Sequence, residues 1–143
     1  MDEARIAAIK QACRELADRY ALYVDERLYD RFGEVFSEDA VLEAGGQRRG
    51  LADIITGMGK RSVGLVSRHV ITNSVVDVLD PENATGLCYL SLYRKLDAAG
   101  PDPALLEGPA LIGVYHDTYR RTPLGWRITH RSLSTTFRRP EAF

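Results

Sequence analysis

The sequence predicts an α+β fold in which helices come first and a long, mostly antiparallel sheet follows. Near the N-terminus, apolar residues recur every three or four positions, which is typical of a helix. From about Leu65 onward, segments rich in β-branched and aromatic residues alternate with turn residues, which indicates strands. A curved, mixed sheet wrapped over the helices would give a cone-like barrel with a cavity between its layers. The length fits a single domain, 1–143.

The helices are predicted from their apolar faces and their ends. The first runs from about Glu3 to Val24, with Asp2 as a plausible N-cap. Its apolar face is formed by Ile6, Ile9, Cys13, Leu16 and Tyr20. A short second helix is expected from Leu28 to Phe36, so Asp25 lies at the junction and can point back along the first helix. A third helix is expected from Leu51 to Met58.

The strands are predicted from alternating residues bounded by turns. Residues 40–44 and 47–49 can pair as a hairpin through Gly45 and Gly46. The four long strands are expected over Leu65–Leu79, Thr85–Leu96, Leu105–Arg121 and Trp126–Arg138. Asp80–Asn83 and Thr122–Gly125 form the turns between them, and residues 98–103 form a loop.

Composition argues against several classes of protein. Lys and Arg total 19 and Asp and Glu 20, so the net charge of −1 offers no general attraction to nucleic acid or to a membrane. No apolar run approaches the ~20 residues of a spanning helix, and Met1–Arg5 lacks a signal-peptide pattern. We therefore expect a cytoplasmic protein whose partner is a small molecule.

Neither a metal nor a cofactor is expected. Cys13 and Cys88 lie far apart within apolar patterns, which favours two buried free thiols. The three histidines have no close spacing that would suit a metal. The glycines of Gly57–Lys60 have the wrong spacing for a phosphate-binding loop, and no strand precedes them.

Asp25 and His69 form the first candidate site. Alternation along the predicted strand places His69 on one face with Ile71, Asn73 and Val75. An imidazole there needs a hydrogen-bond partner, and a carboxylate would fix its tautomer and make the other nitrogen more basic. The ordinary imidazole pKa of ~6.5 suits proton transfer at neutral pH. The alternative is a core histidine bonded to a backbone carbonyl, with Asp25 as a helix-end residue.

Tyrosines form the second group of candidates, because a phenol brings an apolar ring and one hydroxyl to a pocket. The group is Tyr20, Tyr23, Tyr89, Tyr93, Tyr115 and Tyr119. Helical spacing places Tyr20 near Asp25, so it is the favoured hydrogen-bond donor. The same residues would equally suit half-buried positions on strands and helices. Val24, Asn73 and Leu133 complete the predicted substrate-binding lining.

Arg131 is the third candidate. Alternation along the last strand places Ile128 and His130 on one face and Arg131 and Leu133 on the other. An arginine that faces the cavity could hold an anionic group or stabilise developing negative charge. Alternatively, Arg131 pairs with Asp117 as a structural bridge.

Taken together, these residues resemble the SnoaL-like branch of the nuclear transport factor 2-like superfamily. Within it, the chain is most similar to the scytalone dehydratase and hexachlorocyclohexane dehydrochlorinase group. Individual motifs are loose, but their order and spacing match over nearly the whole chain. They are Tyr20–Asp25, Asp30, Phe36–Ala40, Arg68-His69 with Asn73, Gly113–Asp117 and Gly125–Ile128 with Arg131.

The resemblance implies a lyase with an aspartate–histidine dyad, which falls on Asp25 and His69. In such lyases the histidine removes a proton from carbon while water, chloride or another group leaves the next carbon. The dehydrochlorinase-like members add a basic residue on the first helix and an arginine on the last strand. Here these positions are Tyr20 and Arg131, so a phenol would donate a hydrogen bond in place of a cation. The second histidine of the scytalone dehydratases has no clear counterpart.

The leading hypothesis is therefore a cofactor-independent lyase acting on a small cyclic or aromatic molecule. The resemblance also implies a homo-oligomer, either a dimer or a trimer. A ketosteroid isomerase-like or cyclase-like enzyme is the second hypothesis, and only Glu43 could supply its carboxylate base. A non-catalytic binding or assembly module, like the β-subunits of ring-hydroxylating dioxygenases, is the third.

Overall fold

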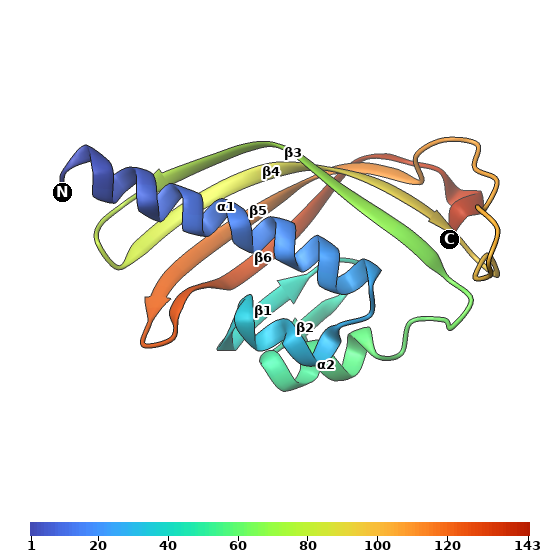
Figure 1. The fold of residues 1–143 in the computed structure, drawn as a ribbon, viewed down its shortest axis with the longest axis horizontal. Coiled ribbons are helices and arrows are strands. Elements are labelled where there is room, and N and C mark those ends of the chain that lie inside the picture. The colour runs from blue at the N-terminus through green and yellow to red at the C-terminus, as the bar shows by residue number, and fades with distance from the viewer.

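The computed structural model describes residues 1–143 and consists of one mixed sheet partly covered by helices (Figure 1). The helices are α1 (Glu3–Asp25) and α2 (Leu51–Met58), with 3-10 helices η1 (Tyr29–Glu34) and η2 (Pro140–Ala142). The strands are β1 (Phe36–Glu43), β2 (Gln47–Arg49), β3 (Val66–Val78), β4 (Asn83–Lys95), β5 (Leu111–Thr122) and β6 (Gly125–Arg138). No helix combines the length and the apolar character that crossing a membrane requires.

The sheet has the order β2-β1-β6-β5-β4-β3 and stays open. β1 runs parallel to β6, and every other neighbouring pair is antiparallel. Figure 1 shows α1 lying diagonally across the concave side of the long strands, with β1, β2 and α2 beside its C-terminal end. The predicted α+β fold is thus confirmed, but the sheet curves like a cone without closing into a barrel.

The core fills the space between α1 and the sheet. Asp2 caps the helix, because its carboxylate accepts the backbone N–H of Arg5 at 2.8 Å. The apolar face of α1 then meets residues of η1 and the strands. The largest buried side chains here include Tyr20, Phe32, Phe36, Leu42, Leu90, Tyr115 and Ile128.

The strand β3 contains a bulge at Asn73 that changes which side chains face inward. Asn73 has a φ of 54°, and the pairing with β4 shifts between Thr72 and Val75. Val76 is therefore buried, whereas Asn73 is exposed and the Val75 residue is 53% exposed. The prediction that Asn73 and Val75 share the face of His69 is wrong, because simple alternation ignores the extra residue.

The strand β6 has a similar irregularity. Asp117 pairs with Arg131 and Tyr119 with Ile128, so one more residue of β6 than of β5 lies between these pairs. Ile128 and Arg131 are consequently both fully buried, and the prediction that they face opposite sides is wrong. His130 turns outward and pairs with Glu43 of β1 at 2.8 Å.

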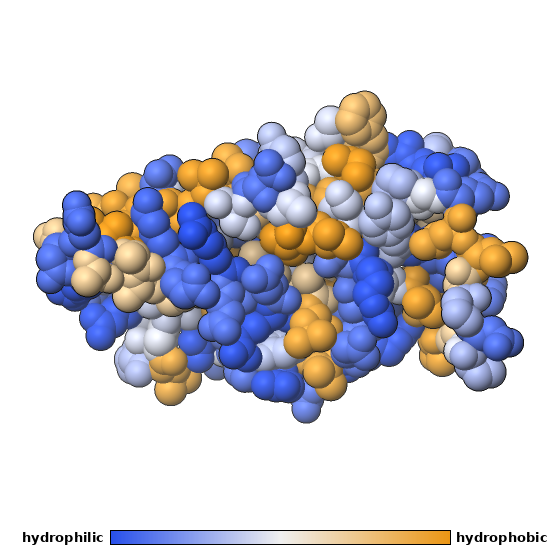
Figure 2. Space-filling model, turned by 45° about the horizontal axis from the view of Figure 1, so that its top comes forward, coloured by the Kyte–Doolittle hydropathy of each residue, from blue (hydrophilic) through white to orange (hydrophobic).

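Two predicted elements have different bounds. The second helix is a 3-10 helix, η1, and Phe36 belongs to β1, where it pairs with Ile128. The strand expected from Leu105 begins only at Leu111, and residues 105–110 are irregular. Leu105 and Leu106 are exposed there. Hydrophobic residues, in orange, gather at the right-hand end of the molecule in Figure 2, the end at which this segment and the C-terminus lie in Figure 1.

Candidate active site

Asp25 and His69 lie in direct contact where the end of α1 meets β3. The Asp25 Oδ1 to His69 Nδ1 distance is 2.7 Å, and Asp25 Oδ2 accepts the backbone N–H of His69 at 2.8 Å. The side chains are only 6% and 9% exposed, respectively. The two residues are 44 positions apart in sequence, so the contact depends on the packing of α1 against the sheet.

The carboxylate of Asp25 is held in its ionised form. Burial raises its pKa, but hydrogen bonds from the His69 ring and backbone and from the Ser67 hydroxyl outweigh burial, so the pKa is lowered. An ionised carboxylate can only accept hydrogen bonds, which assigns the hydrogen of the contact to Nδ1 of His69. In the neutral imidazole, Nε2 is then free to accept a proton.

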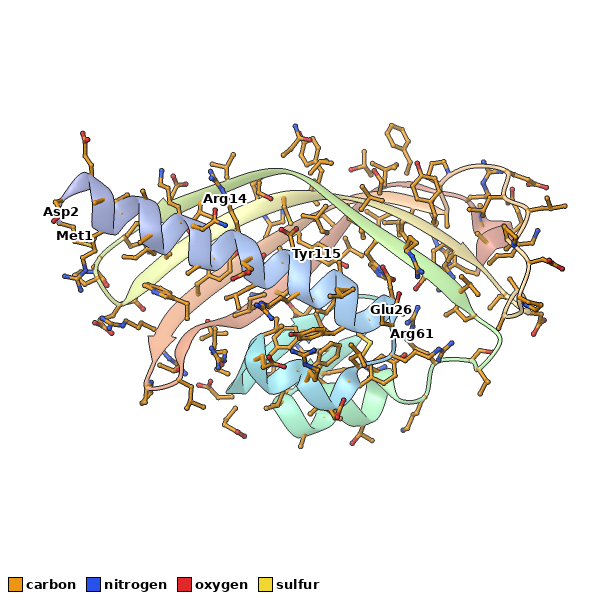
Figure 3. The ribbon with its side chains drawn as sticks, in the orientation of Figure 1. Met1, Asp2, Arg14, Glu26, Arg61 and Tyr115 are labelled. Atoms are coloured by element: carbon orange, nitrogen blue, oxygen red, sulfur yellow. The ribbon has the colours of Figure 1, made fainter.

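Ser67 and Arg61 extend the dyad into a chain of hydrogen bonds. The Ser67 hydroxyl donates to Asp25 Oδ1 at 2.8 Å and accepts from Arg61 Nη2 at 2.8 Å. Arg61 Nη1 also donates to the Val24 carbonyl at 2.8 Å. Figure 3 shows Arg61 beside the C-terminal end of α1, near Glu26. This chain adds a second hydrogen bond to the carboxylate oxygen that the His69 ring contacts.

His69 lines a cavity of about 550 Å³ between the helices and the sheet. Its apolar wall comes from Val24, Met58, Leu90, Leu92, Leu111, Leu133 and Phe143. Polar groups come from Tyr20, Tyr115, Thr135 and four arginines. A cavity of this volume suits a small organic molecule. No three His, Cys, Asp or Glu side chains come close enough together to hold a metal ion.

Tyr20 and Tyr115 join the dyad to the core. The Tyr20 ring meets the His69 ring edge-on at 6.4 Å and the Tyr115 ring at 5.8 Å between centroids. Tyr115 belongs to β5, one of the strands that α1 crosses, and is labelled beside α1 in Figure 3. Burial raises the pKa of both phenols, so both remain protonated donors at neutral pH.

Arg131 lies behind these two tyrosines and outside the cavity wall. Its guanidinium makes two bonds of 2.7 Å to the Asp117 carboxylate, and both side chains are fully buried. It lies 4.7 Å from the Tyr20 ring centroid and 4.1 Å from that of Tyr115. Of the two interpretations of Arg131, the structure supports the structural bridge with Asp117.

The structure divides the predicted substrate-binding residues into two groups. Val24, Tyr115 and Leu133 line the cavity. Tyr23, Asn73, Tyr89 and Tyr93 lie outside the cavity wall.

The excluded residues have simple geometric reasons for their positions. Tyr23 is buried beside Arg19, which donates to its hydroxyl at 3.0 Å. The β4 residues Leu90, Leu92 and Arg94 line the cavity, so alternation places Tyr89 and Tyr93 on the outer face. The bulge turns Asn73 outward.

Several residues of the site escaped the sequence analysis. Ser67 precedes His69 by two positions, so strand alternation alone would have placed it on the same face. Arg61 lies in the segment between α2 and β3, and Arg48 lies in β2, whose three residues are too few for a period to reveal side-chain direction. Arg94 shares the cavity face with Leu90 and Leu92, which the alternation of β4 could have indicated.

The fold and the cavity define a small α+β protein with a buried acid–histidine pair at the wall of an internal pocket. Residues 5–132 match the model of the SnoaL-like domain, and the chain belongs to this family. The predicted resemblance to the SnoaL-like branch is thus confirmed. No curated protein matches the chain.

Solved structures with the same fold cover nearly the whole chain. A type 2 hexachlorocyclohexane dehydrochlorinase, LinA, is 17% identical over 95% of this chain and 90% of its own, with a TM-score of 0.78. A candidate scytalone dehydratase from Novosphingobium aromaticivorans is 18% identical over 95% and 89%, with a TM-score of 0.77. A protein of unknown function from Nostoc punctiforme with a cystatin-like fold is 20% identical over 89% and 90%, with a TM-score of 0.72. At these identities, the likeness shows a shared fold.

Proposed function

We propose that the chain is a cofactor-independent lyase that eliminates a leaving group from a small cyclic or aromatic molecule. The observation that carries this proposal is the 2.7 Å contact between Asp25 and the ring of a histidine that lines the cavity. A ring oriented by a carboxylate on one side and open to a cavity on the other has the geometry of a general base. The names of two structural neighbours, a dehydrochlorinase and a candidate dehydratase, point to the same reaction class.

The proposed step is a proton abstraction coupled to loss of a group. Nε2 of His69 takes a proton from a substrate carbon, and the electrons of that C–H bond form a double bond to the next carbon. The leaving group departs from this second carbon with the electrons of its own bond. The abstracted proton and the departing anion together account for the acid or water released. Asp25 stabilises the imidazolium, and Tyr20 donates a hydrogen bond to the substrate.

The other two hypotheses receive less support. Glu43, the only carboxylate available to an isomerase-like mechanism, pairs with His130 and is absent from the cavity wall. A binding module would have no need of a histidine oriented by a buried carboxylate. Homo-oligomerisation belongs to this proposal as an expectation from the family, to be tested by light scattering.

The test offers the protein a panel of β-hydroxy and β-halo cyclic compounds. Turnover is measured as release of the leaving group. We expect the turnover rate of His69→Ala to be ~10²–10⁴-fold lower than that of the wild type. Its circular dichroism spectrum should stay unchanged. Tyr89→Phe, on the outer face of the same sheet, is the matched control and should retain full activity. Undiminished turnover in His69→Ala, or release of no leaving group by the wild type, would overturn the proposal.

A further inference from the structure

The charged groups of the cavity wall are all positive. Arg48, Arg61, Arg94 and Arg138 line it, and no Asp or Glu does so. The whole chain carries 19 Lys and Arg against 20 Asp and Glu, so this excess does not follow from composition. Four guanidinium groups around one cavity of about 550 Å³ are therefore a local feature of the site.

None of these four arginines pairs with a carboxylate of the chain. Of the twelve other arginines, seven lie within 4.0 Å of one: Arg19, Arg31, Arg68, Arg120, Arg121, Arg131 and Arg139. The cavity arginines form no such pair. Arg61 binds a carbonyl and hydroxyls, and the buried Nε of Arg94 has no hydrogen-bond partner at all. Guanidinium groups at a cavity wall with no carboxylate of the chain to pair with suit an anionic ligand.

Arg94 and Arg138 both contact the ring of Phe143 at the cavity wall. Each guanidinium carbon lies 4.5 Å from the ring centroid of Phe143, so the ring covers one face of both groups. Nε of Arg94 is buried, so the terminal N–H groups are the donors that could bind a carboxylate. Burial, and then the charges of Arg61 and Arg138, lower the pKa of Arg94, as expected for a cation without a counter-ion.

Arg48 reaches the cavity because α2 has a glycine beneath it. A Cβ atom on Gly57 would overlap the Arg48 guanidinium, so any larger residue would displace that side chain. Arg48 thus lies against the backbone of α2 at the cavity wall.

We propose that the ligand of this cavity is a small cyclic carboxylate whose carboxylate is bound by Arg94 and Arg138. This inference names the substrate class of the proposed lyase and rests on that function. The apolar wall would hold the ring of the ligand, and the arginines its charge. Removing a proton next to a carboxylate creates a second negative charge, which is prohibitive unless cations neutralise it. Nearby guanidinium groups would therefore let an imidazole act on such a substrate.

The test compares an anion with a neutral molecule of the same shape. Benzoate and benzamide serve as probes, and calorimetry measures binding to the wild type. Benzoate should bind and raise the melting temperature, benzamide should not, and salt raised from ~0.05 M to ~0.5 M should weaken the binding. Arg138→Gln, at an exposed position, should fold and weaken benzoate binding about tenfold or more. Arg94→Gln should do the same.

The matched control is Arg120→Gln, because Arg120 pairs with Asp39 on the surface and lies outside the cavity wall. It should bind benzoate like the wild type. Equal affinity for benzoate and benzamide, or full benzoate affinity in Arg138→Gln and Arg94→Gln, would overturn the inference. The proposed lyase fails separately: benzoate binding without turnover of any β-substituted carboxylate would refute the reaction and leave the carboxylate site standing.

Discussion

The Asp25 carboxylate receives two hydrogen bonds from His69, one from the ring at 2.7 Å and one from the backbone N–H at 2.8 Å. The second bond ties the last residue of α1 to the backbone of β3. The orientation of the imidazole is therefore coupled to the docking of the helix on the sheet. Asp25 contributes to the stability of the fold as well as to the proposed chemistry.

The first prediction concerns the pH dependence of that stability. We expect Asp25→Asn to lower the free energy of unfolding at pH ~7 and to have a smaller effect at pH ~3. Burial raises the pKa of Asp25, but its hydrogen bonds lower the pKa by more than burial raises it. The folded pKa therefore lies below the unfolded value of ~3.9. Such a group stabilises the protein above its unfolded pKa, and this contribution is lost as the pH falls through the folded pKa.

Urea unfolding of both proteins at the two pH values measures this difference. Asp102→Asn, in an exposed loop, is the control and should follow the wild type at both. If the Asp25→Asn difference were the same at pH ~3 as at pH ~7, ionisation of Asp25 would not be the source of the stabilisation.

Periodicity predicted most of the fold. The helical spacing from Ile6 to Tyr20 and the four long strands needed no tertiary information, because each repeats one period over many residues. The bulges at Asn73 and between Ile128 and Arg131 were missed. A single extra residue leaves the strand-forming character of the sequence unchanged, so the residue types do not reveal it. Both bulges reverse the side-chain faces beyond them, which explains the misplaced Asn73 and Ile128.

The dyad was predicted as a pair, but its surroundings were not. The resemblance to lyases brought Asp25 and His69 together, whereas Ser67 and Arg61 depend on how a loop meets the end of α1. Arg131 was placed correctly on the inner side of β6. Whether it faces the cavity or Asp117 depends on the packing of Tyr20 and Tyr115, which a linear sequence does not encode locally.

The second prediction concerns the buried pair of Arg131 and Asp117. Arg131→Met should destabilise the protein by ~3–5 kcal/mol, because Asp117 is left buried without its partner. Burial lowers the pKa of Arg131, but Asp117 more than compensates for it, so the pKa is raised and Arg131 is charged at neutral pH. The double variant Arg131→Met, Asp117→Leu should recover part of the loss in chemical denaturation.

The matched control for this pair is Arg120→Met, which removes the exposed ion pair with Asp39. Surface pairs contribute only ~0–1 kcal/mol, so its effect should be much smaller. Equal losses for Arg131→Met and Arg120→Met would show that burial does not set the strength of the inner pair.

The third prediction is that both thiols are inert in the folded protein. Cys13 and Cys88 are 0% and 2% exposed. Burial, followed by the charge of Asp117, raises the pKa of Cys13 to about 12, and burial raises that of Cys88 to about 11. At pH ~8 only about one thiol in a thousand or fewer is a thiolate. A colorimetric disulfide reagent should label neither cysteine until denaturant is added, and rapid labelling of the native protein would contradict this.

The fourth prediction concerns the left-handed residue at the β3 bulge. Asn73 has a φ of 54°, a conformation that glycine and asparagine tolerate and β-branched residues do not. Asn73→Gly should change the stability by less than ~1 kcal/mol, whereas Asn73→Val should lower it by ~1–2 kcal/mol or more. Thr72→Val, at the preceding exposed strand position, is the control and should be tolerated. If Asn73→Val were as stable as Thr72→Val, the strand would have to pair without the bulge, and Val76 would then lose its place in the core.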